Sequence, residues 1–291
     1  MTNLAPTLAR AALLAMAFGL ASCASKGGLD SHSDFATGTM PPADQAYAVA
    51  IKQLQDEKYD HAVSDFDAIE ETYPYSTWSK HAQLLAGYAE YKEMDYEDAV
   101  TSLNRFISLH PADQEAAYAY YLKALCYYER IEDVDRDQTA TTQAIAALDD
   151  VITRYPDSAY AQDAQIKLRL AYNRLAGHEM AIGRFYQEQH LYIAAIGRYQ
   201  DVVTSYQTTT YVPEALERMV ETDLDLGLPD AAVRSASVLG YNYPGNPYYA
   251  HAYALLQAHG LVTQAAQSSA DSNAVAPPPA PVAAHHWYWP F

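Results

Sequence analysis

Residues 58–91, KYDHAVSDFDAIEETYPYSTWSKHAQLLAGYAEY, contain two helical patterns separated by a proline. In the first half, apolar side chains recur at the spacing of one helix face. They are Ala62, Phe66, Ile69 and Tyr73. Pro74 disfavours helical geometry at the residue before it and ends this helix. A second apolar stripe follows, at Trp78, Ala82, Leu85 and Tyr88. Neither helix can bury its stripe alone, so the unit needs neighbours.

The same unit recurs when the chain is aligned on five corner residues, which are Pro74, Pro111, Pro156, Gln207 and Pro244. Each copy has Ala twelve residues before the corner and eight residues after it, with a further apolar residue eight before it. The aligned positions are Ala62, Phe66 and Ala82; Ala99, Leu103 and Ala119; Ala144, Leu148 and Ala164; Ala195, Tyr199 and Ala215; Ala232, Ala236 and Ala252. Tandem helix–turn–helix units of this length are typical of a tetratricopeptide solenoid. The sequence therefore predicts an all-α array of about five repeats over residues 43–262, with residues 46–55 as the first helix of the first repeat. The alternative is an irregular helical bundle.

The amino terminus has the pattern of a secretory signal. Arg10 precedes an apolar run over residues 11–21 that is too short to span a membrane as a helix. The run ends in Leu-Ala-Ser-Cys at Cys23, which resembles a bacterial lipobox. This resemblance implies a signal peptide at residues 1–22 and a lipidated Cys23. No Asp follows the cysteine, which implies transfer to the outer membrane, facing the periplasm. A plain signal peptide with a chance cysteine is the alternative.

Two segments lack the composition of packed helices. Residues 23–42 are rich in Gly, Ser, Thr and Asp, which predicts a flexible tether. Residues 263–291 are rich in Ala, Ser and Pro, which predicts a disordered tail. The tail ends in HHWYWPF over residues 285–291. This aromatic end is either a docking motif or an extension without function.

Composition and motifs argue against several classes of function. A formal charge of −18 disfavours nucleic-acid binding. The ten histidines include no H-E-x-x-H and no pair at metal-ligand spacing with a third ligand. No phosphate-binding glycine loop or nucleophile motif is present. Cys126 lies in an apolar helical run and is expected to be a small buried residue rather than a reactive one. We expect no catalytic residue, no metal ligand and no cofactor.

An acidic segment, ERIEDVDRDQ at residues 129–138, separates the second and third repeats. Together with the lipobox, the repeats and the Tyr-Pro corners EETYPYSTW and RYPDSAYAQDA, it resembles the BamD family of the outer-membrane β-barrel assembly machine. The resemblance implies a scaffold that is not an enzyme. Its carboxy-terminal repeats would hold a periplasmic domain of the barrel-inserting subunit, alongside the machine's other lipoproteins. Its amino-terminal repeats would receive the carboxy-terminal signal of unfolded outer-membrane proteins.

Three residues are candidates for these contacts. Arg198 matches a basic position in the family's carboxy-terminal repeats and stands beside the small Gly197, so it could reach an acidic partner; alternatively it pairs within the chain. Tyr73 and Arg105 are candidates for binding a substrate peptide, because such a signal carries aromatic residues and a carboxylate. In the alternative, Tyr73 only packs between repeats and Arg105 pairs with Asp98 or another nearby acid.

Two other assignments remain open. Tyr-Pro-Asp-Ser corners also occur in the periplasmic tetratricopeptide protein of the Tol–Pal system, although that family places a coiled coil ahead of its repeats. No heptad pattern precedes Asp44 here. The other assignment is a lipoprotein that activates a cell-wall enzyme. The partner that co-purifies with the chain distinguishes these three functions.

Overall fold

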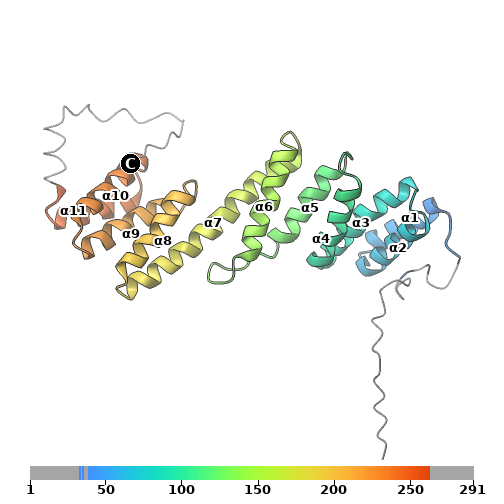
Figure 1. The fold of residues 1–291 in the computed structure, drawn as a ribbon, viewed down its shortest axis with the longest axis horizontal. Coiled ribbons are helices and arrows are strands. Elements are labelled where there is room, and N and C mark those ends of the chain that lie inside the picture. The colour runs from blue at the N-terminus through green and yellow to red at the C-terminus, as the bar shows by residue number, and fades with distance from the viewer. Residues whose placement is uncertain (1–32, 34, 36–38, 263–291) are drawn as a thin grey trace, which may run out of the picture.

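The computed structural model describes residues 33, 35 and 39–262, and all secondary structure within this part of the chain is helical. The helices lie in one elongated array, from α1 at one end to α11 at the other (Figure 1). They are α1 (Ala43–Gln55), α2 (Tyr59–Thr72), α3 (Thr77–Glu93), α4 (Tyr96–Leu109), α5 (Ala116–Tyr128), α6 (Thr139–Arg154), α7 (Ala159–Glu188), α8 (Tyr192–Ser205), α9 (Val212–Asp225), α10 (Pro229–Asn242) and α11 (Pro247–Ala258). The all-α solenoid prediction is confirmed.

Five helix pairs, from α2/α3 to α10/α11, each contain one of the five aligned corners. Residues 46–55, the expected first helix of the first repeat, lie within α1. This helix packs on α2 and α3. It covers the end of the array, where α2 and α3 would otherwise expose their apolar faces.

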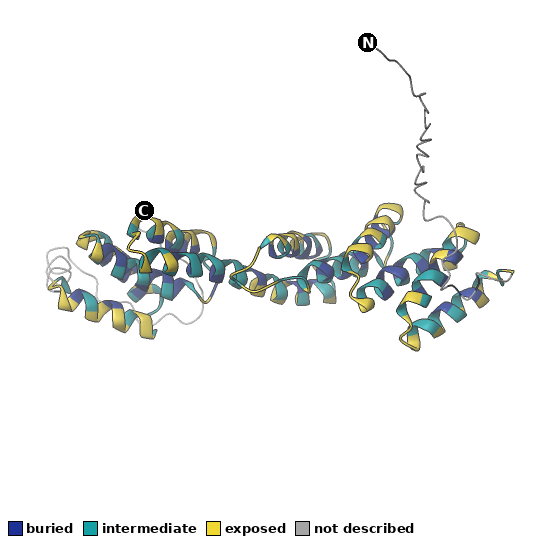
Figure 2. Cartoon of the chain, turned by 90° about the horizontal axis from the view of Figure 1, so that it is seen from below, coloured by how far each residue is buried: buried dark blue, intermediate teal, exposed yellow. Residues whose placement is uncertain are grey.

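The aligned positions of the repeats form the core. All fifteen are buried, with exposed fractions between 0% and 4%. The alanines allow the helices to approach, and residues such as Phe66, Leu103 and Tyr199 fill the space between them. Figure 2 shows the resulting pattern, in which buried residues lie within the array and exposed residues lie at the turns and along the outer faces of the helices.

The five corners share one backbone conformation. The residue before each corner ends the first helix with φ between −124° and −135° and ψ between 42° and 54°. These residues are Tyr73, His110, Tyr155, Tyr206 and Tyr243. Each donates its backbone N–H to the carbonyl four residues earlier. The corner at Gln207 keeps this geometry without proline, so the packing of the repeat also determines the turn.

The joints between repeats use a second recurring device. Glu57, Met94, His190 and Gly227 have φ between 58° and 72°, the left-handed conformation that ends a helix. The next residue donates its N–H to the carbonyl five positions earlier, as Asp95 does to Glu90 at 2.9 Å. Between α5 and α6, residues 129–138 replace this joint.

Residues 129–138 pack against the middle of α7. The Val134 carbonyl accepts a hydrogen bond from Nδ1 of His178, and a Cβ added at Gly177 would lie 3.1 Å from Cγ1 of Val134. Helix α7 is 30 residues long, and its second half packs on α8. It therefore connects the third repeat to the fourth.

Two residues of the expected tether lie against the first repeats. Ser33 donates a hydrogen bond to Oδ1 of Asp65 at 2.9 Å, and Phe35 is buried beside α1 and α2. The predicted signal peptide, Cys23 and the predicted tail over residues 263–291 lie outside the described residues. Among the helices of residues 39–262, none is long and apolar enough to cross a membrane. Cys126 is fully buried, as predicted, and desolvation raises the pKa of its thiol to about 12.

Candidate functional site

Arg198 lies on α8, partly exposed, with its guanidinium bound to a carboxylate of α7. Its Nη1 donates to Oε2 of Glu179 at 2.9 Å. This hydrogen bond raises the pKa of Arg198, and its side chain keeps 39% of its surface accessible. Arg198 therefore forms an ion pair within the chain, but this ion pair does not bury its side chain.

The surface around Arg198 is open. A Cβ added at Gly197 would meet nothing within 4 Å among the described residues. A hollow of about 500 Å³ is lined here by Tyr186, Ala194, Gly197, Arg198, Gln200, Asp201 and Thr204. The Arg198 side chain, 39% exposed beside its pair with Glu179, borders this hollow.

Large apolar side chains are exposed close to this hollow in the sequence. Ile193, one helical turn before Gly197, is 80% exposed, and Leu191 at the start of α8 is 53% exposed. Phe185 on α7, beside the hollow's Tyr186, is 57% exposed. Exposed apolar side chains are typical of protein-binding surfaces. We call Phe185, Leu191, Ile193, Gly197 and Arg198 the α7–α8 surface.

Arg105 on α4 pairs with Glu70 on α2, in a contact made by Nη2 and Oε1. The same Glu70 oxygen accepts a hydrogen bond from Gln83 of α3 at 2.8 Å. Arg105 is 59% exposed at its side chain, whereas Glu70 is 12% exposed. The acid that meets Arg105 therefore comes from the preceding repeat and is not Asp98.

Tyr73 has a structural contact of its own. Its hydroxyl donates to the carbonyl of Pro41 at 2.8 Å, which holds the segment before α1 against the first corner. Since Glu70 lies in the last turn of α2, Arg105 is brought to the same end of that helix as Tyr73. The two candidate residues thus lie near one corner, each with a partner inside the chain.

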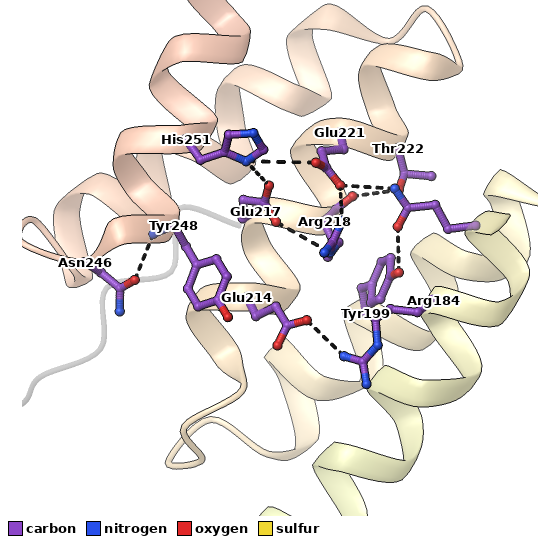
Figure 3. Close-up of polar contacts among 11 residues, drawn as sticks. Arg184, Tyr199, Glu214, Glu217, Arg218, Glu221, Thr222, Asn246, Tyr248 and His251 are labelled. Carbon is purple, nitrogen blue, oxygen red and sulfur yellow. Dashed lines mark hydrogen bonds and ion pairs between the residues drawn. The ribbon is translucent and has the colours of Figure 1, made fainter. Parts of the chain in front are cut away.

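A polar network that the sequence did not reveal joins the fourth and fifth repeats (Figure 3). On α9, Arg218 contacts Glu221 at 2.8 Å and Glu217 at 3.7 Å. His251 of α11 points its Nδ1 toward both carboxylates. Gln187 of α7 links Glu221 to the hydroxyl of Tyr199. The L-E-R-M-V-E pattern shows two acids one turn apart, but only the fold adds the histidine.

A mostly apolar groove of about 640 Å³ runs between α8, α9 and α10. Ile196, Val203, Leu216, Met219 and Val238 contribute to its walls. Asp223, only 4% exposed, and Arg234 also line it. Desolvation raises the pKa of Asp223 to about 6, and Arg234 opposes this shift.

Comparison with known proteins identifies the family. A family model described as "YfiO: Outer membrane lipoprotein" matches residues 40–239. A protein of Caulobacter vibrioides named "Outer membrane protein assembly factor BamD" is 47% identical over 220 residues, which are 76% of this chain and 72% of that protein. The chain belongs to the YfiO/BamD family.

A second BamD relative, from Rickettsia prowazekii, is 42% identical over 84% of this chain and 95% of its own. Among solved structures, the "TPR2AB-domain:pHSP90-complex of yeast Sti1" covers 79% of this chain and 92% of that chain, at 14% identity and a TM-score of 0.39. A similarity this low adds nothing to the fold, which the helices of this BamD-family chain define themselves. The α7–α8 surface and the groove both lie within residues 40–239, which the family model matches.

Proposed function

We propose that this chain is an outer-membrane protein assembly factor. It is a scaffold that binds the barrel-inserting subunit of the β-barrel assembly machine and presents unfolded outer-membrane proteins to it. The observation that carries the proposal is the 47% identity to an assembly factor over 76% of the chain. An elongated repeat array suits this role, because different repeats along it can hold different partners.

The α7–α8 surface is the proposed contact for the barrel-inserting subunit. An acidic group of the partner would replace Glu179 at the exposed guanidinium of Arg198, while Ile193 and Phe185 contribute apolar contact. Because Arg198 already has a carboxylate, binding exchanges one ion pair for another. The exchange is favourable only if the partner also covers the apolar residues and excludes water.

The corner of the first repeat is the proposed contact for substrate. Arg105 is more exposed than its partner Glu70, so a peptide carboxylate can approach its free side. Tyr73 contributes a partly buried ring at the same end of α2. A lipid on Cys23 would hold the scaffold at the outer membrane, facing the periplasm.

Co-purification tests the partner. Arg198→Glu reverses the charge at the proposed contact and should strongly reduce recovery of the barrel-inserting subunit. Arg154→Glu is the matched control, because Arg154 is an exposed arginine of α6 whose pair with Asp150 is within one helix. Both variants should keep the helical circular-dichroism spectrum of the wild type.

Three outcomes contradict the proposal. Equal recovery with both variants would remove the α7–α8 surface from the interface. Recovery of a Tol protein in place of the barrel-inserting subunit would favour the Tol–Pal function, and recovery of a peptidoglycan enzyme would favour the role of an activator.

A further inference from the structure

Three potential metal ligands converge where the fourth repeat meets the fifth. Glu217 and Glu221 lie one turn apart on α9, and His251 lies on α11 (Figure 3). Each offers one donor atom, and the three atoms lie within 4.8 Å of one another. This is the only such group of three among the described residues.

Arg218 orients the two carboxylates. The Oε2 atoms of Glu221 and Glu217 face its guanidinium, at 2.8 Å and 3.7 Å. Their Oε1 atoms face Nδ1 of His251, in a hydrogen bond for Glu217 and at 3.9 Å for Glu221. Each carboxylate thus uses one oxygen for the arginine and presents the other to the imidazole. Neighbours that hold ligands in this way are typical of metal sites in proteins.

The three side chains differ in solvent exposure, and the most exposed one leaves a path by which an ion can enter. The side chain of Glu217 is 2% exposed and that of Glu221 is 20% exposed, whereas that of His251 is 55% exposed. An ion entering past the imidazole would meet two carboxylates at the base of the site. Water could complete its coordination from the open side, as it does in metal sites with three protein ligands.

The electrostatics favour a cation at this position. Burial, followed by the charge of Glu221, raises the pKa of Glu217 to about 6. Among the described residues, Arg218 is the one arginine or lysine that contacts these carboxylates, so two negative charges share one permanent positive charge. A divalent ion between the Oε1 atoms and Nδ1 would supply the missing positive charge, and neutral imidazole would bind it through the Nδ1 lone pair.

We propose that Glu217, Glu221 and His251 bind a divalent transition-metal ion, with Zn²⁺ as the representative ion. One imidazole nitrogen with two carboxylate oxygens suits Zn²⁺ better than Mg²⁺ or Ca²⁺, which prefer oxygen ligands alone. Zinc–ligand bonds of about 2.0–2.2 Å place the donors of a tetrahedral site about 3.3–3.6 Å apart. Small side-chain rotations must therefore bring Oε1 of Glu221 closer to Nδ1 of His251 and move Oε1 of Glu217 away from it. The bound ion would link α11 to α9 and stabilise the carboxy-terminal end of the array.

Isothermal titration with ZnCl₂ tests the proposal. The assay uses the full chain with His285→Ala and His286→Ala, so that the two tail histidines do not contribute. We expect one Zn²⁺ per chain, a thermal midpoint that rises with Zn²⁺ concentration, and no binding of Mg²⁺. In this background, His251→Ala and Glu217→Gln should each weaken Zn²⁺ binding at least tenfold. His259→Ala, an exposed histidine at the end of the same helix, should leave the affinity unchanged.

The proposal fails if the background chain takes up no Zn²⁺, or if it binds with equal affinity after His251→Ala. Glu217 is buried, so Glu217→Gln could unfold the last repeats, which circular dichroism would reveal. Glu221→Gln then provides the second test, because it removes one ligand charge at a less buried position and leaves the hydrogen bond between Glu217 and His251. Unchanged affinity in Glu221→Gln would also overturn the proposal.

Discussion

Gly183 of α7 faces the ring of Tyr199 on α8, so closely that a Cβ at Gly183 would lie 2.8 Å from Cδ1 and 3.0 Å from Cζ of that ring. Tyr199 is fully buried and occupies the large apolar position of the fourth repeat. Its hydroxyl donates to Gln187 at 2.7 Å, which fixes the ring. The absence of a side chain at residue 183 is therefore what allows a tyrosine at this core position.

Gly183→Ala should destabilise the protein by about 1–3 kcal/mol, because the ring cannot move without losing its packing and its hydrogen bond. Gly197→Ala is the matched control, since its Cβ would meet no described atom within 4 Å. The control should be neutral or more stable by up to about 1 kcal/mol, because alanine favours a helix over glycine. Urea denaturation of both variants measures the difference, and equal stabilities would contradict the close approach.

Glu90 should make stability depend on pH. It is partly buried on α3; Oε1 accepts a hydrogen bond from Ser102 at 3.1 Å, and Oε2 is buried without a hydrogen-bond partner among the described residues. Burial raises its pKa from 4.5 to about 8, and nearby Asp67, Asp98 and Asp95 add to the shift. Between pH 4.5 and about pH 8, Glu90 keeps its proton in the folded state and loses it in the unfolded state. The free energy of unfolding therefore falls as the pH rises through this range.

Glu90→Gln should remove the loss of stability with rising pH, because the amide stays neutral throughout this range. We expect a thermal midpoint a few degrees higher than that of the wild type at pH 8 and a much smaller difference at pH 5. Glu93→Gln, on the same helix, serves as the control, because Glu93 is more exposed. A constant difference between Glu90→Gln and wild type across the range would show that Glu90 is already ionised in the folded state.

The corner of the first repeat can be tested with a synthetic carboxy-terminal peptide of a barrel protein. Tyr73→Ala and Arg105→Glu should each reduce crosslinking of the peptide and leave binding of the barrel-inserting subunit intact. Glu70→Gln should maintain or increase crosslinking, because it weakens the competitor for Arg105. Normal crosslinking in both Tyr73→Ala and Arg105→Glu would assign these residues to structure alone.

Tyr73→Phe distinguishes the ring from its hydroxyl. The variant loses only the hydrogen bond to the Pro41 carbonyl, so stability should fall by about 0.5–1.5 kcal/mol. Peptide crosslinking should remain, because the aromatic ring is retained. If crosslinking in Tyr73→Phe is as low as in Tyr73→Ala, peptide binding depends on the hydrogen bond that positions residues 39–42 and not on the aromatic ring.

The anchor prediction concerns Cys23. Cys23→Ala should leave the chain unprocessed or free of the outer membrane, because neither lipid attachment nor cleavage at the lipobox can occur. Metabolic labelling with palmitate, followed by membrane fractionation, measures both effects. An unlabelled wild type, together with a variant that still fractionates with the outer membrane, would exclude the lipobox.

The repeat frame was predictable because its causes are local. Apolar spacing places Ala62, Phe66 and Ala82 on the buried faces, and Pro74 restricts the residue before it. These constraints act within one helix or one turn, and the same constraints recur in each copy.

The partners of the charged residues were not predictable, because they come from neighbouring helices and repeats. Arg105 meets Glu70 35 positions away, and His251 meets Glu217 34 positions away. Such pairs depend on how far each helix pair is rotated against the next, which no local pattern records. The sequence alone therefore determined the helices, the core positions and the resemblance to the family. The tertiary packing decided which carboxylate holds Arg198, which backbone carbonyl holds Tyr73, and that two glutamates of one repeat face a histidine of the next.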